Sequence, residues 1–138
     1  MSVELEWKTI PQDPNNIWIV MTAYGVVDLP ETRMKLQKLG ETLDYFQQYF
    51  SSQKKFMLVF DFSQCKDFAK IDMLGDLKKF LTKYDPLITV SLRKSFILLR
   101  DPAWKFFLNL VFAFRPPKQP YALEMPPNLY EAIRHRYR

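Results

Sequence analysis

The side chains that most often carry out chemistry are scarce in this sequence and stand apart from one another. The chain has one histidine, His135, in a basic C-terminal tail, and one cysteine, Cys65, with no base near it in the sequence. Nucleophilic catalysis needs a nucleophile beside a group that takes its proton. We therefore interpret His135 as a surface residue and Cys65 as a packing residue, and predict that the protein is not an enzyme.

Carboxylates gather once, around the end of an apolar run. Asp61 and Asp67 lie near one expected strand end, and Asp72 follows in the next expected helix. Such a set could bind a cation or act in acid–base chemistry, but capping and solvation explain it better without a second ligand cluster. With only three glycines, the chain has no glycine-rich loop for phosphate. We expect no metal ion and no cofactor.

Charge is unevenly distributed along the chain. Residues 1–69 carry seven Lys or Arg and nine Asp or Glu, a net charge of −2, whereas residues 70–138 carry thirteen and six, a net charge of +7. A basic half can attract an anionic membrane surface or nucleic acid. Because the basic residues are spread over several elements without a nucleic-acid-binding motif, we expect no nucleic-acid partner. Peripheral membrane contact stays open.

Length and composition indicate one globular domain. A chain of 138 residues that is 48% hydrophobic can bury its own core. The longest apolar run, around Phe106–Phe114, is interrupted by Asn109 and is too short to cross a bilayer. The acidic, alternating N-terminus does not resemble a signal peptide, and the single cysteine fits a reducing compartment. We expect a cytoplasmic protein in which residues 1–138 form a single domain.

Five segments have the patterns of strands. Residues 3–10 alternate between apolar and polar, which is typical of a half-buried strand, and two continuous apolar runs are typical of strands buried on both faces. A proline places the last segment near an edge of the sheet. The expected strands are Val3–Ile10, Ile17–Tyr24, Lys55–Phe62, Ser95–Leu99 and Gln119–Met125.

Four segments have the spacing of helices. The first begins near Pro30 and buries a face that recurs at steps of three and four residues: Leu36, Leu39, Leu43, Phe46 and Phe50. The others cover Phe68–Tyr84, Pro102–Phe114 and Leu129–Tyr137. The sequence therefore predicts an α/β fold, a single mixed sheet of about five strands covered by about four helices. The order is β-β-α-β-α-β-α-β-α, with Lys55–Phe62 and Ser95–Leu99 as central strands.

This order and these lengths resemble a STAS domain, the fold of anti-sigma-factor antagonists and of transporter cytoplasmic tails. The second half, roughly residues 55–125, also resembles CRAL-TRIO lipid-binding domains through FMLVFDFSQ, IDMLGDLKKFLTKYDP, SFILLRDP and WKFFLNLVFAF. The STAS resemblance implies a regulatory protein-binding module, and the CRAL-TRIO resemblance implies a bound lipid. The phosphorylatable Ser of regulated antagonists has no counterpart in residues 68–72, and the N-terminal helical part of CRAL-TRIO domains is absent.

The expected helix Pro102–Phe114 points most directly to function. One of its faces is apolar enough to cover a sheet, yet further aromatic residues fall on the flanks and leave only a narrow polar stripe. The surplus is covered either by the final helix and N-terminal residues or by a partner, a second copy, an apolar ligand or a membrane. The candidate binding residues are Trp104, Phe106, Leu110 and Phe112. We expect a non-catalytic module that binds a protein partner there; the alternative is a small domain that binds a lipid or other hydrophobic ligand.

Overall fold

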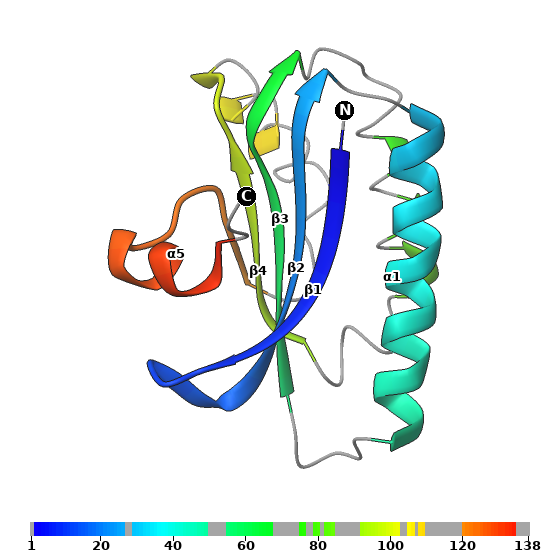
Figure 1. Ribbon diagram of the computed structural model, residues 1–138, viewed down its shortest axis with the longest axis vertical. Coiled ribbons are helices and arrows are strands. Elements are labelled where there is room, and N and C mark those ends of the chain that lie inside the picture. The colour runs from blue at the N-terminus through cyan, green and yellow to red at the C-terminus, as the bar shows by residue number, and fades with distance from the viewer. Residues whose placement is uncertain are drawn as a thin grey trace.

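The chain folds around one mixed β-sheet of five strands (Figure 1), seen in a computed structural model. The residues described are 2–26, 29–49, 55–67, 75–76, 79–80, 82–84, 92–102, 105–106, 108–109 and 120–134. The strands are β1 (Ser2–Ile10), β2 (Asp13–Val26), β3 (Lys55–Asp67), β4 (Leu92–Leu99) and β5 (Tyr121–Ala122). The α/β class and the single mixed sheet expected from the sequence are confirmed.

The strands lie side by side in chain order, β1-β2-β3-β4-β5. β1 and β2 form an antiparallel hairpin, and every later neighbour pair is parallel. The two most apolar strands are β3, third of the five, and β4, which lies between β3 and β5. Neither is an outer strand, as the expected topology requires. Two-sided burial explains their positions, because a strand covered on both faces can carry a continuous apolar run.

Several strand limits differ from those expected. β2 begins at Asp13 rather than Ile17, because the two-residue turn at Pro11 and Gln12 lets Ile10 pair with Asp13. Backbone pairing does not need apolar side chains, so the hairpin extends past the hydrophobic run. At the other end of the chain, the sequence predicted a seven-residue strand over 119–125. Only Tyr121 and Ala122 form β5, and residues 120 and 123–125 are not in a strand.

The helices cover both faces of the sheet. α1 (Leu29–Tyr49) runs along one face and the short α5 (Pro127–Ile133) lies on the other (Figure 1). These are the two helices described with bounds, so the expected number of about four is not confirmed. Residues 75, 76, 79, 80, 82 and 83, and residues 102, 105, 106, 108 and 109, are also in helical conformation.

Alternation along β3 divides the apolar side chains between two cores. Phe56, Leu58, Phe60 and Phe62 contribute to the larger core, which also contains the buried residues of α1. Val59 contributes to the smaller core. The larger core is completed by Phe80 and Leu108, and the smaller one by Ile10, Trp18, Val20, Phe96, Leu98 and Ile133. The helical residues between the parallel strands thus pack on the same side of the sheet as α1.

The predicted buried face of α1 is confirmed for Leu36, Leu39 and Leu43. Gly40 lies beside this face, and a Cβ built there would come within 2.6 Å of Tyr84 Cζ. The Tyr84 side chain therefore approaches α1 closely at Gly40, and a larger residue there would require the Tyr84 ring to shift.

Replacing Gly40 with alanine is expected to lower the free energy of unfolding by about 1–3 kcal/mol, because the added methyl group overlaps the Tyr84 ring. Gly75 is the matched control, since no atom of the described residues lies within 4 Å of its built Cβ, and a helical glycine of this kind should gain up to about 1 kcal/mol from the same change. Urea denaturation measures both. Equal effects of the two substitutions would contradict the close approach of Tyr84.

Candidate functional site

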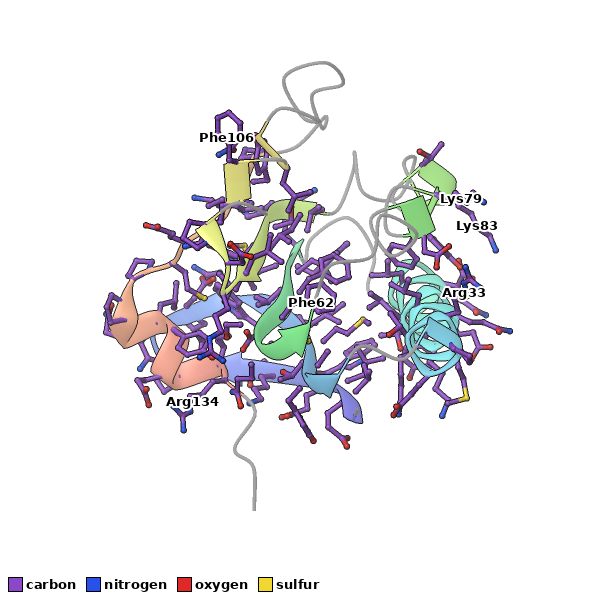
Figure 2. All side chains as sticks on the ribbon, turned by 90° about the horizontal axis from the view of Figure 1, so that it is seen from above. Arg33, Phe62, Lys79, Lys83, Phe106 and Arg134 are labelled. Carbon is purple, nitrogen blue, oxygen red and sulfur yellow. The ribbon has the colours of Figure 1, made fainter. Side chains whose placement is uncertain are left out.

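Phe106 is the most exposed large hydrophobic residue among those described. Its side chain is 67% exposed, whereas Leu108, two residues later, is 3% exposed and belongs to the larger core. Two residues along a helix turn the side chain by about 200°, so these two point in nearly opposite directions. Figure 2 shows the Phe106 ring projecting outward from its helical segment. The other predicted binding residues, Trp104, Leu110 and Phe112, lie outside the described residues.

Two polar contacts flank Phe106 and join its helical segment to the region around β5. Lys105 Nζ forms a salt bridge of 3.3 Å with Glu124 Oε1, and the Tyr121 hydroxyl donates to Asn109 Oδ1 at 3.5 Å. Both are at the surface, where such pairs add little stability. They place polar groups on the same helical segment as an exposed aromatic ring.

A second group of functional side chains, here called the Asp61 cluster, consists of Asp61, Ser63 and Tyr130. Asp61 lies in β3 and is fully buried on the face that carries α5. Its Oδ1 accepts hydrogen bonds from the Ser63 backbone N–H at 3.0 Å and from Ser63 Oγ at 2.5 Å. Its Oδ2 accepts one from the Tyr130 hydroxyl at 2.8 Å. The carboxylate is thus bonded through both oxygens.

The Asp61 cluster ties α5 to the sheet. Tyr130 lies in α5, and the same helix buries Ile133 against the smaller core. Lys8 of β1 donates through Nζ to the backbone oxygens of Ile133 at 2.8 Å and Arg134 at 3.1 Å. A cation at the carbonyl end of a helix is favourable because the terminal carbonyls lack partners and carry partial negative charge. A seven-residue helix has little stability of its own, so these contacts hold it in place.

Two acidic groups near Asp61 retain their protons. Burial raises the pKa of the Cys65 thiol to about 11, and the negative charge of Asp61 adds to this effect. Burial raises the pKa of Tyr130. A hydrogen bond with Ser63 opposes this effect, and the negative charge of Asp61 reinforces it. The Tyr130 proton is therefore held more tightly in the folded chain, and this contribution to stability is lost at alkaline pH. Thiol and hydroxyl are both weak nucleophiles when protonated.

Thr22 adds an unexplained polar atom next to this cluster. Thr22 is the β2 residue in register with Asp61, is 1% exposed, and its Oγ1 has no hydrogen-bond partner among the described residues. A buried hydroxyl without a partner costs free energy relative to an apolar group of the same shape.

The Thr22→Val protein is expected to be more stable than the wild type by about 1 kcal/mol, because the change removes this unpaired hydroxyl at nearly constant volume. Thr42→Val is the control, because Thr42 Oγ1 donates to the Lys38 carbonyl at 2.9 Å. Removing this bonded hydroxyl should not make the protein more stable. Thermal unfolding compares the two. Loss of stability in Thr22→Val would mean that the hydroxyl has a bonded partner.

The structure brings together only part of what the sequence singled out. Asp61 lies close enough to Cys65 for its negative charge to raise the pKa of the thiol, whereas Asp72 and His135 are outside the described residues and nothing is described of the Asp67 side chain. Among the side chains that are described, no three His, Cys, Asp or Glu residues gather closely enough to hold a metal ion. Tyr130 and Thr22 were missed by sequence reasoning. The only signal for Tyr130 is its place on the apolar side of a short helix beside Leu129 and Ile133.

Comparisons with known proteins add no family assignment. No protein-family model, curated protein or solved structure matches the chain. Nor does any helix in the described parts of the chain have the length and apolar character needed to cross a membrane.

Proposed function

We propose that this protein is a non-catalytic interaction module, similar to a STAS domain, that binds a protein partner through an apolar helix surface. That surface consists of Trp104, Phe106, Leu110 and Phe112. The observation that carries the proposal is the exposure of Phe106 at 67% on a helical segment that already buries Leu108 in the larger core. The segment therefore has an inner anchor in the sheet and an outer aromatic side chain left for another molecule.

The surroundings of Phe106 support a protein as that other molecule. Protein interfaces typically place an aromatic side chain at the centre of a patch and polar groups at its rim. The Lys105–Glu124 salt bridge and the Tyr121–Asn109 hydrogen bond supply such polar groups next to the ring. A partner that covers Phe106 would remove a large apolar area from water while leaving these pairs at the edge.

The state of the Asp61 cluster supports a role without catalysis. Both carboxylate oxygens of Asp61 already accept hydrogen bonds, and the nearby Tyr130 and Cys65 have raised pKa values. A general base needs a free acceptor within reach of the proton that it takes. We assign the cluster to holding α5 on the sheet in a cytoplasmic protein of one domain.

The finer topology is part of the same proposal. We infer that the helical residues between β3 and β4, and those between β4 and β5, belong to two further helices, which gives about four with α1 and α5. Parallel neighbouring strands need crossover connections, and Phe80 and Leu108 pack in the same core as α1. The order would then be β-β-α-β-α-β-α-β-α, similar to STAS and CRAL-TRIO domains.

Organic extraction of the purified chain, followed by mass spectrometry of the organic phase, distinguishes a protein-binding module from the lipid-binding alternative. The proposal predicts no stoichiometric lipid in the extract, with or without prior incubation with mixed phospholipid vesicles. One molecule of lipid per chain that disappears in the Phe106→Ser variant would assign the surface to a hydrophobic ligand or to peripheral membrane contact instead.

A further inference from the structure

The outer face of α1 carries two large apolar side chains that are about half exposed. Met34 is 48% exposed and Tyr45 is 51% exposed, and the exposed residues Lys38 and Glu41 lie between them. These four residues, here called the α1 stripe, follow one another at steps of 4, 3 and 4, which keeps them on one side of the helix. The buried side of α1, with Leu36, Leu39 and Leu43, is opposite.

We propose that two copies of this chain form a weak dimer by packing their α1 stripes against each other in antiparallel orientation. Steps of 4, 3 and 4 read the same in both directions along the helix. A twofold axis between residues 39 and 40 therefore places Met34 in the same layer as the partner's Tyr45, and Lys38 in the same layer as the partner's Glu41. A twofold interface requires this kind of self-complementary patch.

Polar side chains continue the contact on both flanks of the stripe. The axis keeps each flank on its own side, so Lys35 faces the partner's Thr42 and Gln37 faces the partner's Asp44. The pair of opposite charges nearest the axis is therefore Lys38 with the partner's Glu41. Charge complementarity of this kind suppresses wrong pairings and fixes the register of an interface. A parallel arrangement would instead place Lys38 against Lys38 and Glu41 against Glu41.

One contact within the chain orders the tyrosine for this role. The rings of Tyr45 and Trp7 of β1 pack edge to face with their centroids 6.1 Å apart, and Trp7 is itself 37% exposed. A ring that is held in place loses less conformational freedom when a partner covers it. Trp7 also extends the apolar area beyond the helix, toward the outer edge of the sheet.

The contact is small, which sets the expected strength. The α1 stripe spans eleven residue steps, or about 16 Å along the helix axis. Helix pairs of this length bury less than the standard interface, so the dimer should be weak and depend on concentration. Its surface is separate from the proposed partner site: Figure 2 shows Arg33, which lies on α1, on a different side of the molecule from Phe106.

Analytical ultracentrifugation of charge-reversal variants, at protein concentrations up to about 1 mM, tests the dimer. Lys38→Glu alone places only acidic side chains around the axis, and Glu41→Lys alone places only basic ones. Each single variant should dimerise about tenfold or more weakly than the wild type, since attractive charge pairs are replaced by repulsive ones. An equimolar mixture of the two should associate at least as well as the wild type, because every charge contact between the unlike chains is then attractive.

The rescue by mixing separates this interface from other effects of the substitutions. Any loss of α1 stability caused by like charges within one chain persists in the mixture and cannot produce association. Lys79→Glu, at an exposed position outside α1, is the control and should leave the dimer unchanged. A wild-type chain that stays monomeric at the highest concentration would overturn the proposal, as would single variants that dimerise like the wild type or a mixture that fails to associate. None of these results bears on the Phe106 surface.

Discussion

Replacing Asp61 with alanine should lower the free energy of unfolding by about 2–4 kcal/mol, a large fraction of the stability of a domain of this size. The loss has a specific cause. Without the carboxylate, the Ser63 backbone N–H, Ser63 Oγ and the Tyr130 hydroxyl lose their common acceptor in a partly buried setting. Each unpaired buried donor costs about 1–3 kcal/mol, reduced where water can reach it. Urea denaturation monitored by circular dichroism measures the change.

The controls separate the Asp61 cluster from a general effect of removing a carboxylate. Glu124→Ala removes an exposed carboxylate that pairs with Lys105, and should change stability by less than about 0.5 kcal/mol. Tyr130→Phe should cost about 1–2 kcal/mol alone but much less in the Asp61→Ala background, because both changes break the same bond. Additive effects of Asp61→Ala and Tyr130→Phe would contradict the assignment of the cluster to holding α5.

The sheet could be predicted because the apolar pattern of each strand reflects how many of its faces are buried. The continuous run in β3 indicated burial on both faces, and β3 lies at the centre of the sheet with one core on each side. The alternation in β1 indicated a half-buried strand, and on its apolar side Val3 is 1% exposed whereas Trp7 is 37% exposed. The limits of β2 and β5 could not be predicted, because they depend on backbone pairing with a neighbour rather than on side-chain pattern.

The two candidate sites differ in how much the sequence revealed. Helical spacing alone placed Phe106 on a flank of its helix and Leu108 toward the sheet, and their exposures agree with this division. The Asp61 cluster joins residues 69 positions apart in the chain. Nothing local to Tyr130 indicates that its hydroxyl reaches β3, since that contact exists only once α5 lies on the second face of the sheet.

Changing Phe106 to serine is expected to weaken binding of the protein partner by about thirtyfold or more while changing the free energy of unfolding by less than about 0.5 kcal/mol. The two effects separate because the ring is 67% exposed in the free chain, so the monomer loses little when it is removed. At an interface the same ring would be covered, and aromatic residues at the centre of a patch carry much of the binding energy.

Met34→Ser supplies a matched control, because it also removes an exposed apolar side chain but from α1. It should leave partner binding within about threefold of the wild type, a difference below about 1 kcal/mol. Unfolding of Phe106→Ser at much lower urea concentration with an unchanged slope would place the ring in the core of the folded chain. The interaction surface would then need another location.

The most direct measurement is isothermal titration calorimetry of the wild type, Phe106→Ser and Met34→Ser against the partner protein recovered on the immobilised wild-type chain from cells that encode it. The proposed function predicts saturable binding of one partner per chain, about thirtyfold weaker for Phe106→Ser and nearly unchanged for Met34→Ser. Equal affinities of Phe106→Ser and the wild type for that partner would contradict binding through the Phe106 surface.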